Sequence, residues 1–532
     1  MPIQRNMAVA LCCLLLTPIW PIQNHNLPQV DFESRSFTLP VCNDGTPSVI
    51  AELVLTIEKP TKFEQLTLSD IATTDRRDIE SLRLVLDQKP PVAFASLDEL
   101  KASNKFQGSL TLSKGKHRFQ LVVVSRKGAN LLNKLDLRMD EFTIDGVAVP
   151  ISEQPGSRIR QRFAYPIHHR NQFDCHTFRI PGIARANNGD LLAVYDMRYN
   201  SRRDLQEHID IGLSVSKDGG QTWSDPKPIM DMGEFGGKSQ KENGCSDPVI
   251  LVDRQTGEIF VAACWTHGKP NTHQWSGNGS EPGWELDQST QFMVVRSSDH
   301  GESWSQPDNL TKQLKQKEWY LFAPAPGNGI TLADGKLVIP TQGRDENGLP
   351  FSNITWSEDH GKTWNVSPPA RDNTTECAVA ELSDGSLMLN MRDNRNRKLK
   401  DETNGRAISV TDDFGKTWQR HDSDHQLLPE PVCMASMISV QVKLASGKRA
   451  HRLFFSNPNN KHRRAGMTIR VSSDEGTTWP HQVLLDSRGG AYSSLVEIDD
   501  KTIGILYESS VADFVFQKIP IHELMGPKPN TR

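Results

Sequence analysis

One eight-residue pattern, [ST]-x-D-x-G-x-[ST]-W, recurs five times in this chain of 532 residues. The copies occupy residues 216–223, 297–304, 357–364, 411–418 and 472–479. Their aspartates stand at 218, 299, 359, 413 and 474, so the intervals are 81, 60, 54 and 61 residues. Recurrence at a spacing of this order is typical of propellers and other repeat arrays, in which each repeat is one supersecondary unit. The chain must therefore fold largely as repeated β-sheets.

The residues of the pattern point to a tight turn rather than to catalysis. Apolar stretches such as 211–215 and 467–471 precede the copies and predict strands. Within the motif, Asp accepts hydrogen bonds from turn N–H groups, Gly supplies a positive φ, and Trp packs against the sheet. We expect each copy to form a hairpin turn between two strands of one blade.

The first 155 residues have a different texture. Stretches 48–58 and 117–124 are rich in Val, Ile and Leu, and turn residues separate them. We expect a smaller antiparallel β-sandwich over residues 24–155, a linker over 153–162, and the propeller over 156–532. An accessory carbohydrate-binding role and a structural spacer both fit the sandwich. The segment up to 155 is expected to be dispensable for turnover.

The N-terminus predicts export. Arg5 precedes the ten-residue apolar run 7–16, which is typical of a signal peptide, and we assign residues 1–23 to it. A bilayer span needs about 20 apolar residues, and no later segment has that length. The protein is therefore expected to be secreted or periplasmic, with no membrane span. Its net charge of −4 gives no sign of a nucleic-acid partner.

Cysteine and histidine usage argues against a metal centre. Six cysteines follow the signal segment without any C-x-x-C pair, so zinc clusters are not expected, and one or two disulfides stay open. His168, His169 and His176 have no carboxylate or thiol at ligand spacing. No metal and no cofactor are predicted. The cysteines after the signal segment are Cys42, Cys175, Cys245, Cys264, Cys377 and Cys433.

A short motif before the first repeat carries a family resemblance. Residues 178–181 read Phe-Arg-Ile-Pro, and the five copies of the repeated pattern follow. Each copy is called an Asp box below. This combination resembles the exo-acting sialidases (neuraminidases) and covers roughly residues 165–515. The resemblance implies an all-β fold with a six-bladed β-propeller as catalytic domain. It also implies hydrolysis of terminal sialic acid, with sialylated glycans, glycoproteins or glycolipids as partners.

The resemblance further implies a triad of arginines. Arg179 matches the first by its Arg-Ile-Pro context, Arg392 matches the second within 387–393, and Arg464 matches the third within 463–470. The neighbouring Arg463 leaves the third assignment ambiguous by one residue. Sialic acid carries a carboxylate on its anomeric carbon, and Arg offers a permanent charge with a bidentate fork.

The same resemblance implies the bond-breaking residues. Tyr492, in 489–496, matches the nucleophile, and Glu376, in 374–378, matches the base that takes its proton. A neutral phenol suits this substrate because a carboxylate nucleophile would be repelled by the substrate's own carboxylate. Asp204 matches the general acid/base, and Asp210 is the competing aspartate.

Further residues complete the expected pocket. Arg198 resembles an arginine that contacts a sugar hydroxyl, Glu508 resembles the carboxylate that orients the first arginine, and Asp247 is expected to line the pocket. Three tryptophans between the first two boxes are candidates either for contacts to the substrate or for ordinary packing: Trp265, Trp275 and Trp284.

The predicted function is an exo-α-sialidase that acts with retention through a tyrosyl-enzyme intermediate. Two alternatives remain. A trans-sialidase, including the intramolecular kind, differs in water access and acceptor contacts. A non-catalytic sialoglycan-binding propeller would need the arginines but not Tyr492, Glu376 and Asp204.

Overall fold

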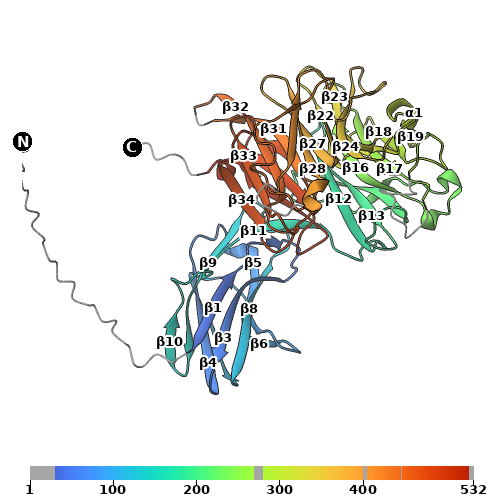
Figure 1. Ribbon diagram of the computed structural model, residues 1–532. Helices are drawn as coiled ribbons and strands as arrows, with labels where there is room; N and C mark the ends of the chain where they lie inside the picture. Colours follow the sequence, from blue (N-terminus) through green and yellow to red (C-terminus); the bar gives the residue numbers. More distant parts are fainter. Residues whose placement is uncertain (1–29, 269–279, 399–403, 445, 527–532) are drawn as a thin grey trace, which may run out of the picture.

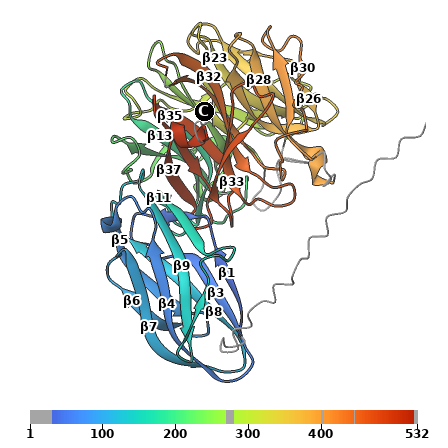
Figure 2. The same cartoon turned by 90° about the vertical axis from the view of Figure 1, so that its left-hand side faces the viewer.

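The computed structural model describes residues 30–268, 280–398, 404–444 and 446–526 (Figure 1). Almost all regular structure in these ranges is strand. A β-sandwich built from the N-terminal residues extends from one side of a larger body of radially arranged sheets, and the two views in Figures 1 and 2 agree on this arrangement. The short helices are η1 (Arg76–Asp78), η2 (Phe235–Gly237), η3 (Gln240–Glu242), α1 (Thr311–Leu314), η4 (Asn394–Arg397) and α2 (Ile521–Leu524).

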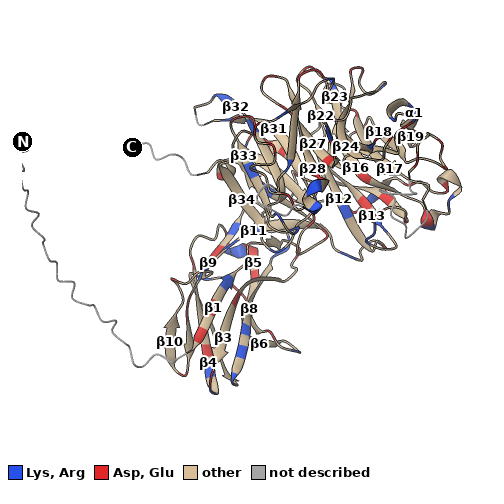
Figure 3. Cartoon of the chain, viewed as in Figure 1, with Lys and Arg blue, Asp and Glu red and all other residues tan. Residues whose placement is uncertain are grey.

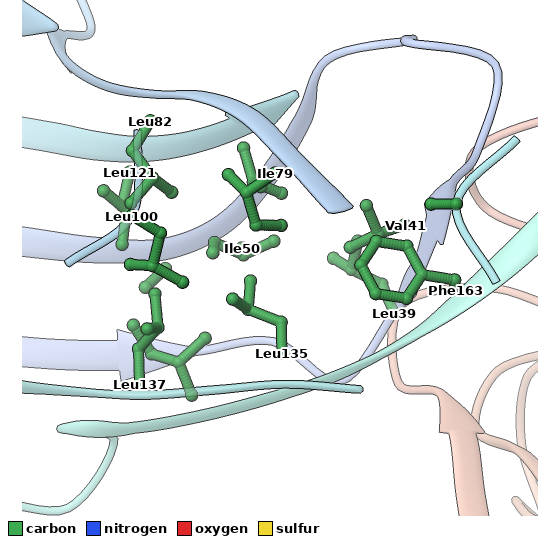
Figure 4. Packing of buried hydrophobic residues seen from close by; sticks show 14 of the residues in the cluster. Leu39, Val41, Ile50, Ile79, Leu82, Leu100, Leu121, Leu135, Leu137 and Phe163 are labelled. Carbon is green, nitrogen blue, oxygen red and sulfur yellow. The ribbon is translucent and has the colours of Figure 1, made fainter. Parts of the chain in front are cut away.

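The first sheet of the sandwich is antiparallel. Apolar residues on its inner face pack against the second sheet, as Figure 4 shows for Ile50, Leu82 and Leu121 facing Leu135 and Leu137. In spatial order its strands are β1 (Asp31–Ser36), β3 (Ser48–Ile57), β8 (Gly115–Ser125), β5 (Ile79–Leu86) and β6 (Val92–Leu97).

The second sheet of the sandwich continues into the propeller. Its β9 strand alternates between buried and half-buried positions over most of its length, as expected for a strand with one face on a core. The strands on the sandwich side are β7 (Ser103–Leu112), β4 (Thr61–Asp70), β9 (Lys134–Ile144), β10 (Val147–Pro150), β11 (Arg158–His168) and β2 (Pro40–Cys42).

Strand β11 belongs to both parts of the molecule. Its residues Arg158–Arg162 pair with β9 of the sandwich, and Tyr165–His168 pair with β37 of the propeller. One hydrophobic cluster also runs from Phe163 to Phe178 and Trp223 across the junction. The expectation of a linker over residues 153–162 is therefore wrong for its second half, because Arg158–Arg162 form an internal strand of a shared sheet.

The propeller consists of antiparallel sheets that follow one another along the chain. Strands such as β13, β16 and β17 are buried along their whole length, because neighbouring sheets cover both of their faces. The first two sheets contain β12 (Thr177–Arg185), β13 (Leu191–Arg198), β14 (Ile209–Ser216) and β15 (Lys227–Met230), and then β16 (Cys245–Val252), β17 (Ile259–Trp265), β18 (Gln291–Ser297), β19 (Asp308–Asn309) and β21 (Gly327–Asn328).

The third sheet contains two short extra strands at its margins, β22 and β26. The third and fourth sheets contain β20 (Leu321–Pro324), β22 (Ile330–Thr331), β23 (Leu337–Arg344), β24 (Pro350–Ser357), β25 (Asn365–Val366) and β26 (Arg371–Asp372), and then β27 (Thr374–Glu381), β28 (Leu387–Asp393), β29 (Ala407–Thr411) and β30 (Gln419–Arg420).

The last strands close the ring. The inner strands contact one another in chain order, and β35 contacts β12, so the end of the chain returns to its first propeller sheet. This confirms an all-β propeller, while the count of six blades stays a prediction. The remaining strands are β31 (Ser436–Lys443), β32 (Arg449–Pro458), β33 (Met467–Ser472) and β34 (His481–Asp486), followed by β35 (Ser493–Asp499), β36 (Thr502–Tyr507) and β37 (Phe514–Pro520) beside β11.

Each Asp box forms the expected hairpin turn. In the first box, between β14 and β15, Asp218 accepts hydrogen bonds from the Ser216 hydroxyl and from the Thr222 N–H and hydroxyl, and the Trp223 indole donates to Gly220 O at 3.2 Å. The same bonds to the aspartate recur in the other boxes. One detail is new: the residue before each motif glycine also has a positive φ, as at His300 with 62°.

All six cysteines after the signal segment are buried free thiols, so none of the described residues forms a disulfide. Within the ranges described, no helix is long and apolar enough to cross a membrane. The predicted signal peptide lies outside the described residues.

Candidate active site

The predicted site residues gather around one cavity of about 600 Å³ at one end of the ring. Seven of them line it directly, namely Arg179, Asp204, Asp247, Glu376, Arg392, Arg464 and Tyr492. Arg464 lines the cavity and Arg463 is not among its lining residues, which favours Arg464, and its role as the third arginine stays a prediction. Glu508 and Arg198 are also absent from the lining, and both bind residues that belong to it. Figure 3 shows both signs of charge among β12, β13, β16 and β28, the strands that carry Arg179, Arg198, Asp247 and Arg392.

Irregular backbone aims several side chains into the cavity. Strands β12, β16 and β27 each shift register beside the site, between Arg179 and Gly182, between Ser246 and Val249, and between Thr374 and Cys377. Ile180 and Asp247 have φ values of 63° and 62°, a backbone conformation that residues other than glycine rarely adopt. Such bulges re-aim side chains at functional sites, and the strain persists only because the surrounding sheet holds it.

Tyr492, Glu376 and Arg392 form a buried triangle. The Tyr492 hydroxyl donates a hydrogen bond to Glu376 Oε1, and Arg392 Nη1 donates to Glu376 Oε2 and, at 3.0 Å, to the Tyr492 oxygen. Burial alone would raise the pKa of Glu376, but the Arg392 charge and these hydrogen bonds outweigh it and lower that pKa. Burial and the Glu376 charge raise the pKa of Tyr492 well above its usual value. The resting pair is thus a phenol beside a carboxylate base.

The other two arginines flank the Tyr492 ring. The Arg179 and Arg464 guanidinium carbons lie 5.5 and 5.4 Å from the ring centroid. Arg464 is held by Val432 O at 2.9 Å. All three guanidinium groups therefore lie around the Tyr492 side chain and line the cavity, and this arrangement suits a carboxylate ligand.

Glu508 fixes the first arginine. Its two oxygens accept hydrogen bonds from Arg179 Nε and Nη2 at 3.1 and 3.2 Å, and Oε1 also accepts from the Ile180 N–H at 3.1 Å. The bidentate contact uses one edge of the guanidinium. Arg179 Nη1 remains on the side of Asp204, at 3.7 Å from Oδ1. This geometry agrees with the orienting role expected of Glu508.

Asp204 stands at the rim of the cavity on a buried support. Its side chain is 44% exposed, and Oδ1 accepts a hydrogen bond from Arg198 Nη1 at 2.8 Å. Arg198 is fully buried and also donates to Asp196 Oδ2 through Nε and Nη2, at 3.1 and 2.8 Å. In this arrangement Arg198 holds Asp204 from below. Its predicted contact with a sugar hydroxyl stays a prediction.

Asp247 brings a third carboxyl group to the cavity wall, after Asp204 and Glu376. Burial raises its pKa well above the usual value, and the negative charges of Asp196, Glu376 and Asp204 add to this effect. Its backbone N–H donates to Asp196 Oδ1 at 3.1 Å. A protonated Asp247 can donate a hydrogen bond to a substrate oxygen.

Some candidates lie elsewhere. Asp210 is buried away from the cavity lining and accepts from the Tyr199 hydroxyl at 2.8 Å, and burial raises its pKa to about 7. Trp265 is buried in a core cluster and Trp284 donates to Lys315 O, so neither lines the cavity. Trp275 lies outside the described residues.

Sequence reasoning missed several residues of the site. Gln342 and Arg344 of β23, and Asn394 and Arg397 of η4, line the cavity without any motif around them. Asp196 lies beneath the cavity, and its place in the sequence offered one indication. It stands two residues before Arg198 on β13, so the two side chains share a face of the strand. No group of three or more His, Cys, Asp or Glu side chains that could hold a metal ion occurs in the described ranges.

Comparisons with known proteins agree with this geometry. Residues 189–506 match the family described as BNR repeat-like domain. A sialidase of Bacteroides fragilis is 43% identical over 423 residues, which cover 79% of this chain and 76% of that protein. The solved structure of the Hadza microbial sialidase Hz136 has a TM-score of 0.86 at 36% identity, covering 92% of this chain and 99% of that one.

A more distant structure shares the fold alone. The intramolecular trans-sialidase from Ruminococcus gnavus has a TM-score of 0.53 at 19% identity, covering 66% of this chain and 96% of that chain.

Proposed function

This chain belongs to the sialidase family, and we propose that it is an exo-α-sialidase that hydrolyses terminal sialic acid from sialylated glycoconjugates with retention. The observation that carries the proposal is the buried contact between Tyr492 and Glu376 inside a ring of three arginines. Binding a sialic acid carboxylate needs only the arginines. A phenol hydrogen-bonded to a carboxylate base is a nucleophile with its proton acceptor already in place.

In the first step, the arginines bind the substrate carboxylate and present the anomeric carbon to Tyr492. The phenol oxygen forms a bond to that carbon while its proton passes to Glu376. The bond from the anomeric carbon to the leaving oxygen breaks, and Asp204 donates a proton to that oxygen. The products are a free aglycone and a sialyl-enzyme adduct, an aryl ketal in which the Tyr492 oxygen is bonded to the anomeric carbon.

In the second step, Asp204 acts as the base. It removes a proton from water, whose oxygen attacks the anomeric carbon as the bond to Tyr492 breaks. The phenolate recovers its proton from Glu376. Two displacements at one carbon give net retention. The exposed position of Asp204 supports this role, because water and leaving group both reach it from solvent.

Incubation with a fluorogenic sialoside, followed by NMR of the released sugar, tests the proposal. Release of free sialic acid as the α-anomer first is the expected result. An anhydro sugar or transfer to an added lactose acceptor would instead identify a trans-sialidase. Absence of turnover with sialic acid still bound would identify a binding propeller.

Export is part of the proposal. The apolar run 7–16 after Arg5 supports cleavage of a signal peptide near residue 23. N-terminal sequencing of the protein recovered outside the cytoplasm tests this, since an intact Met1 would contradict it.

A further inference from the structure

The wall of the cavity opposite Tyr492 has no assigned role. Tyr492 directly precedes β35, and the ring runs from β35 through β12 and β16 to β23 on one side and through β31 and β27 to β23 on the other. The third sheet is thus the one farthest around the ring from the nucleophile. It contributes Leu321, Gln342, Arg344 and Pro350 to the cavity.

The orientation of the sugar follows from the proposed function, on which this inference rests. The arginine triad fixes the carboxylate, and Tyr492 faces the anomeric carbon C2. The aglycone leaves from C2 beside Asp204. The opposite end of the sugar, which carries the N-acyl group at C5 and the hydroxylated C7–C9 tail on C6, must therefore face the third sheet.

Arg344 is the charged group of that wall. Its Nη2 donates to Ser280 O at 3.3 Å and its guanidinium carbon lies 5.7 Å from the Tyr320 ring centroid. Its Nε is buried and has no acceptor among the described residues. Burial lowers the pKa of Arg344, and the nearby Glu281 charge offsets only part of this. Among the described residues only Nη2 has an acceptor, and the guanidinium lines the cavity, so other N–H donors of Arg344 can serve a ligand there.

The N-acyl group and the C7–C9 tail are expected to contact different residues of this wall, because those residues differ in burial. Leu321 and Gln342 are buried, and Gln342 Nε2 donates to Pro324 O at 3.2 Å, so they offer an apolar surface and an amide oxygen to the N-acyl group. Arg344 is half-buried at the end of β23, where the hairpin to β24 begins. The C7–C9 tail extends farther from the sugar ring than the N-acyl group does. It carries several acceptor oxygens, which suit a guanidinium with several donors.

We propose that Arg344 is a specificity-determining residue that binds the hydroxyl groups of the C7–C9 tail of sialic acid. The enzyme would then favour sialosides with an intact polyhydroxyl tail over those with a shortened one. The interaction is made far from the bond that breaks.

A two-by-two comparison of enzyme and substrate tests this. One substrate is sialyllactose, and the other is the same compound after mild periodate oxidation and borohydride reduction, which shortens the tail to C7. The wild type should lose about 10- to 100-fold in kcat/KM on the shortened substrate, as expected for a lost charged hydrogen bond. Relative to the wild type, Arg344→Met should lose a similar factor in kcat/KM on intact sialyllactose. On the shortened substrate its kcat/KM should be close to that of the wild type.

Controls separate this contact from a general effect. Arg397→Met removes another cavity arginine on η4, beside the triad, and should reduce kcat/KM by the same factor on both substrates. Arg344→Lys should recover part of the loss. Thermal melting of Arg344→Met checks that the fold is intact.

Two outcomes would overturn the proposal. Arg344→Met could lose equally on both substrates, or its loss could depend on N-acetyl against N-glycolyl sialyllactose instead of on the tail. With either result the wild type still cleaves sialosides, so the proposed function is unaffected. If the wild type cleaves no sialoside at all, the proposed function itself fails.

Discussion

The phenol hydroxyl of Tyr492 donates its hydrogen bond to the carboxylate of Glu376, a residue 116 positions earlier in the chain. The contact is buried and Arg392 completes it from the side. Two residues that no local motif connects thus form one buried pair. Its removal gives the most direct test of the mechanism.

Tyr492→Phe deletes the proposed attacking oxygen and keeps the ring that Arg179 and Arg464 contact. We expect normal folding, retained sialic acid binding, and a loss of turnover of about 10²–10⁴-fold, equivalent to about 2.7–5.4 kcal/mol in barrier height. A fluorinated mechanism-based sialoside should label Tyr492 of the wild type and leave the Phe variant unlabelled. Peptide mass spectrometry that finds the label on Glu376 or Asp204 would contradict the nucleophile assignment.

Arg392→Ala should affect binding and chemistry together. The substrate carboxylate loses one of its three cationic partners, at a cost of about 2–5 kcal/mol. Glu376 and Tyr492 also lose a hydrogen-bond donor. Steady-state kinetics should show a higher KM as well as a lower kcat. An unchanged KM would remove Arg392 from the carboxylate site.

Asp196→Asn tests the support beneath the acid/base residue. Asp196 balances the charge of Arg198, which holds Asp204. Without that charge Arg198 is held less firmly, and so is Asp204. We expect kcat to fall about 10- to 100-fold through misplacement, with a smaller change in KM. Asp210→Asn is the control, and an equal fall of kcat in both variants would refute this role.

His425 predicts a pH dependence of stability. Hydrogen bonds to Asp393 and Asp424 raise its pKa from 6.5 to about 9, while Arg395 and Arg371 bind the same carboxylates. A raised pKa means that protonated His425 stabilises the folded state fully below pH 6.5, and that this contribution is lost as the pH rises through about 9. Urea unfolding of the wild type should therefore show a larger loss between pH 6.5 and 9.5 than that of His425→Gln. Parallel curves would contradict the prediction.

Deletion of residues 1–155 should prevent folding. The N-terminal half of β11 would lose β9, and the shared cluster around Phe163 and Phe178 would lose its sandwich partners. This replaces the expectation that the sandwich is dispensable. Circular dichroism and a melting curve of the truncated protein check this prediction, and a cooperative transition with full turnover would restore the earlier expectation.

Residues 24–155 also contain no Trp or Tyr, the rings best suited to stack on sugars.

The sequence by itself determined the Asp-box turns and, with them, the propeller. Each box closes its hydrogen bonds within eight residues, as Asp218 does with Ser216 and Thr222, so no distant part of the chain is needed to recognise it. The motif contexts of Arg179, Arg392 and Tyr492 likewise marked residues that the structure brings to one cavity.

Only the tertiary structure decided the rest. Whether Asp204 or Asp210 lines the cavity depends on the direction of a loop, and the position of Arg344 opposite Tyr492 depends on the order of sheets around the ring. The sharing of β11 depends on a strand from each side pairing with it. These relationships join separate segments of the chain, as in the pairing of Tyr165 with Phe516, through backbone hydrogen bonds and side-chain burial. A local pattern does not record them, because its residues interact only with their neighbours in the chain.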